Sequence, residues 1–185
     1  EVVIARGVVV AEGGEIQVDC PHLDWPDDAR ATVHLGRDLT AQDFEIAAPA
    51  GAESARVKVI GVVENQAPTR ALSADLPVRD GLIEGTGDTC QIALVERHRG
   101  TGGVTNAFVS GFGYTGRMAL ASTVAHDSHH MIVVGTDRAM MAAAANRLAD
   151  QMLDVPRSVL SEAVFKTSQA EGFVVFALTV RYGQL

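Results

Sequence analysis

The stretch MIVVGTDRAMMAAAANRLAD, residues 131–150, decides the fold class of this chain. Its first four residues are apolar and fit a short buried strand. Thr136 and Asp137 follow, and their side chains are of the kind that caps the start of a helix. The residues after them are mostly Ala, Met and Leu, which are strong helix formers. We therefore predict a strand followed by one long helix over residues 136–150.

Upstream of this helix, apolar runs recur at short intervals and predict strands. The run at residues 56–63 becomes solidly apolar, and the run at 69–78 stops at Arg79-Asp80-Gly81, a turn signal that favours a hairpin with residues 82–84. Thr40 with Asp43 resembles the start of a further helix, although Glu or Gln is preferred at the second position. Two more strands are expected over residues 90–96 and 104–113.

The two ends of the chain add further predicted elements. Short runs separated by glycine turns predict a β meander within residues 2–19, and residues 21–28, with two prolines and Trp25, indicate a connection. Near the other end, residues 158–169 suggest a second helix and residues 173–181 a final strand. We expect an α+β fold with a mainly antiparallel or mixed sheet, a long helix and a short N-terminal meander. The expected parts are residues 1–20, a linker at 21–29, and a domain at 30–185.

The composition argues against several function classes. The 185 residues are 47% hydrophobic, which is enough to bury a core. The formal net charge of −8 disfavours a nucleic-acid backbone or an anionic membrane as partner, and no apolar run reaches the roughly 20 residues that span a bilayer. Cys20 and Cys90 lie far apart and predict reduced, partly buried thiols. The acidic composition favours a cytoplasmic protein, and the opening on Glu1 in place of Met suggests a processed or excised segment.

Two polar stretches lie at the ends of predicted apolar strands, one after a strand and one just before another, and are the candidates for chemistry. Residues 122–130, STVAHDSHH, contain three histidines and Asp127 within five positions. Imidazole and carboxylate groups bind zinc, manganese or iron, and a carboxylate can also orient a histidine by a hydrogen bond. The spacing fits no standard metal motif, however, so a hydrogen-bonded loop that joins strands is an equally good interpretation.

The second polar stretch is ERHRGTGG, residues 96–103. Arg97 and Arg99 could pair with Asp127 or with a substrate, and the glycines allow a backbone to approach closely. No Gly-Lys-Ser or Gly-Lys-Thr ending follows, so a phosphate-binding loop is disfavoured. The simpler alternative is an exposed turn with two surface arginines. Residue patterns alone thus predict an α+β protein with a functional patch around residues 96–101 and 122–130.

These stretches resemble the C-terminal domain of adenine deaminases of the amidohydrolase type. The similarity is carried, in order, by VERHRGTG at 95–102, GFG at 111–113, ASTVAHDSH at 121–129 and IVVGT at 132–136. It covers roughly residues 1–150, and the opening residues 2–14 look like return strands of the small β domain that follows an amidohydrolase barrel. It departs from the family at His130, where an Asn is expected, and again beyond Asp150.

The resemblance implies the C-terminal part of an enzyme that hydrolyses adenine to hypoxanthine and ammonia. It also implies that a divalent metal ion, manganese, iron or zinc, is bound by a barrel outside this chain. The isolated chain is then expected to hold no cofactor and to be inactive, while the complete protein forms a homo-oligomer. One alternative is a non-catalytic module for folding or oligomerisation, and another is a stand-alone metal hydrolase that uses the histidine cluster.

The resemblance also suggests roles for individual residues. We expect His126, Asp127 and His129 to lie nearest the purine and to orient it or the groups behind it. Glu96, His98 and Ser122 are expected to contribute to substrate binding. None of these residues is predicted to be a metal ligand.

Overall fold

The computed structural model describes residues 1–19, 32–114, 116–125, 128–154, 165–168 and 173–176. The chain divides into two compact units, Glu1–Arg30 and Ala31–Leu185. We call them the N-terminal unit and the main unit.

The N-terminal unit is a small antiparallel sheet. Its strands are β1 (Val2–Ala5), β2 (Val8–Glu12) and β3 (Glu15–Ile16), in that spatial order. Most of its Val and Ile side chains are exposed, Ile4 by 65%. The predicted β meander is confirmed, and its apolar side chains have no core of their own to enter.

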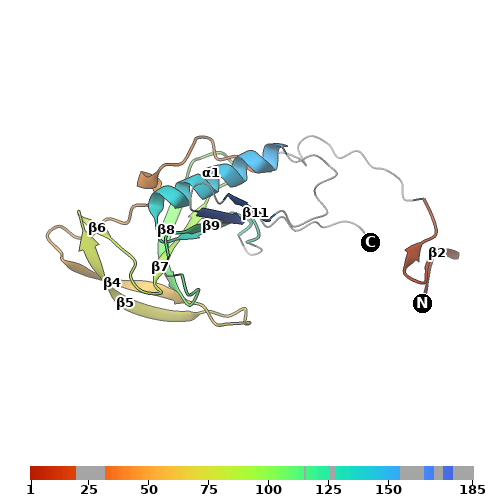
Figure 1. Cartoon of the computed structure of the whole chain (residues 1–185), viewed down its shortest axis with the longest axis horizontal. Helices are drawn as coiled ribbons and strands as arrows, with labels where there is room; N and C mark the ends of the chain where they lie inside the picture. Colours follow the sequence, from red (N-terminus) through yellow and green to blue (C-terminus); the bar gives the residue numbers. More distant parts are fainter. Residues whose placement is uncertain (20–31, 115, 126–127, 155–164, 169–172, 177–185) are drawn as a thin grey trace. The chain divides into compact units, whose positions relative to one another are not determined.

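Among the described residues, the main unit is built around a seven-stranded sheet (Figure 1). The spatial order is β6-β5-β4-β8-β7-β10-β9. Among the strand pairs that the structure describes in this sheet, β4 and β8 alone are parallel, so the predicted mainly antiparallel or mixed sheet is confirmed. The strand bounds are β4 Ser54–Gly61, β5 Arg70–Arg79, β6 Leu82–Ile83, β7 Cys90–Val95, β8 Val104–Ser110, β9 Ala119–Ser122 and β10 Met131–Gly135.

The hairpin predicted from the Asp-Gly signal joins β5 to β6. Val78 pairs with Ile83, and Arg79 pairs with Leu82, which leaves two residues for the turn. Asp80 and Gly81 both have positive φ, 51° and 78°, as a two-residue turn of this kind requires. The prediction is confirmed because the turn chemistry is local.

The long helix α1 (Arg138–Asp154) follows β10 directly. It starts two residues later than predicted because Thr136 still bonds to the sheet, its N–H donating to the Met118 carbonyl at 2.9 Å. Asp137 is the residue that caps the helix, since its carboxylate accepts the Met140 N–H at 3.0 Å. The helix packs on β9 and β10 (Figure 1).

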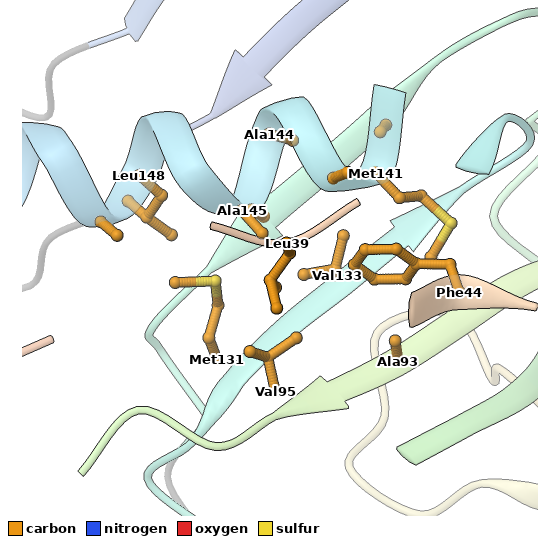
Figure 2. Packing of buried hydrophobic residues seen from close by; sticks show 14 of the residues in the cluster. Leu39, Phe44, Ala93, Val95, Met131, Val133, Met141, Ala144, Ala145 and Leu148 are labelled. Carbon is orange, nitrogen blue, oxygen red and sulfur yellow. The ribbon is translucent and has the colours of Figure 1, made fainter. Parts of the chain in front are cut away.

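The largest hydrophobic core lies between α1 and one face of the sheet (Figure 2). Leu148 and Met141 reach from the helix toward Val95, Met131 and Val133 on the strands. Leu39 and Phe44 fill the space beside them, and burying one such side chain fully is worth about 2 to 3 kcal/mol. This layer fixes the helix on the sheet and therefore fixes the ends of β7, β9 and β10.

A segment outside the sheet helps close this core. The predicted helix start at Thr40 is a single 3-10 turn, η2 (Ala41–Phe44), in which the Asp43 carboxylate accepts the Thr40 N–H at 2.7 Å. Asn146 of α1 holds the same segment, exchanging two hydrogen bonds of 2.9 Å with the backbone of Leu39. The turn is short because the chain next extends to Ala47, which forms a bridge with Leu82.

The C-terminal region differs from the prediction. The predicted helix over 158–169 is wrong at its end, because Phe165–Ser168 forms β11, which pairs antiparallel with β12 (Phe173–Phe176). Pairing with the apolar strand β12 overrides the weak helix propensity of this segment. Strand β9 was not predicted either. No helix among the described residues is long and apolar enough to cross a membrane.

Candidate functional site

The two polar stretches meet at one end of the sheet. Residues 96–103 join β7 to β8, and the loop after Ser122 joins β9 to β10. Val95 pairs with both Val104 and Met131, and Ser122 pairs with Ile132. Both connections therefore lie at the same end of these strands. We call residues 96–103 and 122–130 together the motif end.

Glu96 organises the first of these loops. Its carboxylate accepts the N–H groups of His98 at 2.6 Å, Arg99 at 2.9 Å and Thr101 at 3.2 Å, together with the Thr101 hydroxyl at 3.1 Å. Partial burial raises the pKa of the Glu96 carboxyl, but these hydrogen bonds outweigh it and lower the pKa to about 2. The carboxylate is therefore ionised at neutral pH and is used to shape its own loop.

Arg97 connects this loop to two other segments. Its Nε donates to the His129 carbonyl at 2.7 Å, and an Nη atom donates to the Thr32 carbonyl at 2.8 Å. Its own carbonyl accepts the His34 N–H at 2.7 Å. Burial lowers the pKa of the guanidinium. The alternative of an exposed turn with two surface arginines therefore fails for Arg97, which is half-buried. It fits Arg99, whose side chain is exposed.

His98 and His130 lie side by side across the two loops. Their ring centroids are 5.1 Å apart and the rings are inclined by 51°. The Nδ1 atom of His130 is buried and has no hydrogen-bond partner among the described residues. Neighbouring His129 has a left-handed φ of 56° and an exposed side chain. An imidazole nitrogen that is buried without a partner is available to a ligand or to a further residue of the loop.

The predicted site residues can now be placed. Glu96, His98, Ser122 and His129 all lie at the motif end, whereas His126 and Asp127 lie outside the described residues. Ser122 is half-buried, and its hydroxyl accepts the Val124 N–H at 3.1 Å, so it shapes the second loop as Glu96 shapes the first. The roles assigned to these residues stay predictions.

Arg37 and Asp43 support the motif end and were not predicted. The Arg37 guanidinium binds both carboxylate oxygens of Asp43, one of them at 2.8 Å, and also donates to the Gly102 carbonyl at 3.1 Å. The hydrogen bond from Arg37 is the main cause that lowers the pKa of Asp43 to about 2. These residues lie some 60 positions from the loop in sequence, and no local pattern signals such a contact.

Gly36 and Gly100 bring the same two segments into direct backbone contact. Both have positive φ, 79° and 64°. A Cβ atom on Gly36 would overlap the carbonyl oxygen of Gly100. Glycine is therefore required at position 36 both for its conformation and for the space it leaves.

A pocket of about 600 Å³ lies at the opposite end of β7 and β10. We call it the pocket end; its lining includes Glu84, Cys90, Tyr114, Asp137 and Arg138. Cys90 is a free, buried thiol, as predicted for it, and burial followed by the charge of Asp88 raises its pKa to about 11. Cys20 lies outside the described residues. No three potential ligands of the His, Cys, Asp or Glu type come together anywhere in the described part of the chain.

The fold and the motif end together define an α+β domain whose polar site is built from two adjacent hairpin loops. Residues 66–152, which include the whole motif end, match the adenine deaminase C-terminal domain. The match agrees with the resemblance seen in the sequence.

Comparison with curated proteins extends the match toward the start of the chain. A protein of Ruegeria sp. strain TM1040 named adenine deaminase is 77% identical over 150 residues, 81% of this chain and 25% of the relative. The adenine deaminase of Paracoccus denitrificans is 72% identical over 148 residues, and that of Moorella thermoacetica is 44% identical over 149 residues. The chain matches their C-terminal region and spans about a quarter of their length.

Proposed function

We propose that this chain is the C-terminal part of an enzyme that hydrolyses adenine to hypoxanthine and ammonia. The observation that carries the proposal is the 77% identity to a protein named adenine deaminase over 81% of the chain. Identity at this level, across a region that contains the complete motif end, favours the same substrate class. The cytoplasmic location and homo-oligomeric assembly expected from the sequence are part of this proposal.

Within that enzyme, the motif end helps to shape the purine site. Its exposed imidazoles, His98 and His129, and the buried Nδ1 of His130 offer nitrogen atoms that can donate to or accept from a purine ring. Glu96 and Ser122 hold the two loops from within, so their part in substrate binding is to keep those imidazoles in place. His126 and Asp127 belong to the same loop in sequence and are assigned the orienting role that the resemblance suggests.

The catalytic metal ion, manganese, iron or zinc, is assigned to a barrel elsewhere in the complete protein. The Glu96 carboxylate, which could otherwise be a ligand, already accepts four hydrogen bonds from its own loop. The described residues of the motif end therefore fit a role in orienting substrate better than a role in holding the ion. When bound in its barrel, the ion would activate the water that attacks the purine.

The N-terminal unit is proposed to belong to the small β domain of such an enzyme. The three short strands leave most of their Val and Ile side chains exposed, and such a small sheet gains stability by covering its apolar face. Pairing with further strands of the complete protein would bury those side chains.

The test is a turnover assay on the complete protein that contains this chain, with its metal ion supplied. We expect release of ammonia from adenine, and we expect His126→Ala and Asp127→Asn each to lower kcat/KM by about 10- to 100-fold. Absence of turnover with adenine would contradict the proposed activity. Turnover that both substitutions leave unchanged would contradict the role of the motif end.

The second candidate function is a non-catalytic module for folding or oligomerisation. It is favoured by one observation, namely that Glu96, Ser122 and Arg97 direct their polar atoms to the backbone of their own domain. Under this alternative, substitutions at the motif end lower the melting temperature or change the oligomeric state, and kcat per folded molecule stays the same.

A further inference from the structure

We propose that Arg97 is a positioning residue of the purine site and that it acts by holding the backbone of residues 128–130 in place. This inference rests on the proposed function, because it gives the loop a role in turnover. The sequence suggested Arg97 as a partner of Asp127 or of the substrate; among the described residues, the geometry assigns its guanidinium to two backbone carbonyls.

The first argument is the position of the two acceptors. Nε of Arg97 reaches the His129 carbonyl at 2.7 Å, and Nη reaches the Thr32 carbonyl at 2.8 Å. Thr32 and Arg97 are 65 residues apart, and His129 and Arg97 are 32 residues apart. A single planar guanidinium therefore joins three separate segments, and the ammonium group of a lysine lacks the fork needed to reach both carbonyls.

The second argument is the conformation of the residue that Arg97 holds. His129 has φ of 56°, a left-handed conformation that costs a residue with a Cβ atom roughly 1 to 2 kcal/mol. The turn is supported by the His129 N–H, which donates to the Ala125 carbonyl at 2.6 Å, and by Arg97 on the carbonyl side. Removing the guanidinium takes away one of these two supports, and the loop is then free to leave the strained conformation.

The third argument is what the turn presents. His129 directs its side chain to solvent, while His130, the next residue, is half-buried against His98 with its Nδ1 enclosed. The left-handed residue between Ser128 and His130 sets the directions of both imidazoles. A shift of the His129 carbonyl would therefore move the groups that the proposal places at the purine, and displacements of about 1 Å can lower turnover about 100-fold.

The experiment compares three variants of the complete protein, assayed with adenine well below their melting temperatures. Arg97→Gln removes the fork, Arg97→Lys keeps only the charge, and Arg99→Gln is the matched control with an exposed side chain on the same loop. We expect kcat to fall about 10- to 100-fold in Arg97→Gln, with a smaller change in KM. Arg97→Lys should lie between Arg97→Gln and the parent, and Arg99→Gln should match the parent.

Amide hydrogen exchange of residues 128–130 supplies a readout of position that does not depend on turnover. It should be faster in Arg97→Gln than in Arg99→Gln. If Arg97→Gln does not fold, Arg97→Lys decides: parental kcat and parental exchange in that variant would overturn the inference. A lower melting temperature with unchanged kcat in either Arg97 variant would overturn it as well.

The two proposals fail in different ways. If His126→Ala and Asp127→Asn lower turnover while Arg97→Gln keeps the parental kcat, the inference about Arg97 is wrong and the proposed function stands. If all three leave turnover unchanged, the purine site does not involve the motif end and both proposals fall.

Discussion

The two ends of strands β7 and β10 are built on different principles. At the pocket end a main stabilising contact is local, since Asp137 caps α1 through Met140, three residues on, while the ion pair between Arg138 and Glu84 is long at 3.6 Å. At the motif end the stabilising contacts come from far away, since Arg37 and Arg97 each bridge a separation of 65 residues. Both ends use carboxylates and arginines, but the hydrogen bonds of Arg37 and Arg97 tie the loops of the motif end directly to residues 32–43.

This difference indicates where a small change should have large consequences. When a helix cap is lost, the first turn of the helix frays. When a contact between residues 32–43 and the motif end is lost, a whole loop becomes free to move. The motif end should therefore be the more sensitive of the two, both in stability and in the geometry that it offers to a ligand.

Gly36→Ala should have the largest effect on stability. The substitution places a Cβ atom against the Gly100 carbonyl at a left-handed position, so we expect a loss of about 3 kcal/mol or more in the free energy of unfolding. Gly81→Ala is the matched control, because Gly81 has the same φ sign but open space around it, and it should cost about 1 to 2 kcal/mol. Urea unfolding of the chain measures both. Equal losses would show that the contact with Gly100 does not matter.

Glu96→Gln should weaken the motif end in a pH-dependent way. The pKa of Glu96 is about 2 in the fold against an ordinary 4.5, so its contribution is fully present above pH 4.5 and is lost as the pH falls toward 2. The variant should unfold at lower urea than the parent at pH 7, and the gap should narrow by pH 3. Glu84→Gln at the pocket end is the control, since its ion pairs are long, 3.5 and 3.6 Å. A gap that does not depend on pH would contradict the assignment.

Asp137→Ala tests the pocket end. Loss of the cap on α1 should cost about 1 kcal/mol in the free energy of unfolding. Asp137→Ser keeps a capping oxygen and should recover most of that loss, although it gives up the ion pair with Arg117 at 2.8 Å. If serine is as damaging as alanine, the ion pair and not the cap supports this end.

Arg56→Gln should have the smallest effect. Arg56 pairs with Asp75 on the exposed side of β4, with side chains 71% and 63% exposed, and such a pair contributes about 0.5 kcal/mol or less. Arg37→Gln, which breaks the pair with Asp43 and the contact with Gly102, should cost clearly more in the same urea experiment. Similar losses would mean that the motif end does not depend on the distant segment.

The pocket end and the hairpin of β5 and β6 follow the sequence closely because their signals are local. The Asp-Gly turn and the cap followed by Ala and Met are each contained within a few residues, and both appear as predicted, with the start of α1 displaced by two residues. The helix prediction failed at Phe165–Ser168 for the opposite reason, because pairing with β12, and not the local propensity of the segment, makes it a strand.

The motif end could be located from the sequence but its support could not. Residues 96–103 and 122–130 were predicted as one patch because the first stretch follows one predicted apolar strand and the second precedes another, and the strand pairing does bring them together. No local sequence pattern predicts the contacts of Gly36 and Arg37, because they depend on how residues 32–43 pass between the loop and α1. The same applies to the hydrogen bond that Arg97 donates to the Thr32 carbonyl.

The most direct test of a purine site at the motif end is kcat/KM for adenine in the complete protein with one substitution at each end. His129→Ala changes the exposed imidazole of the motif end, and Glu84→Gln changes the pocket end while leaving the motif end intact. We predict that His129→Ala lowers kcat/KM about tenfold or more and that Glu84→Gln leaves it at the parental value. Parental kcat/KM in His129→Ala, or an equal loss in both variants, would contradict the account.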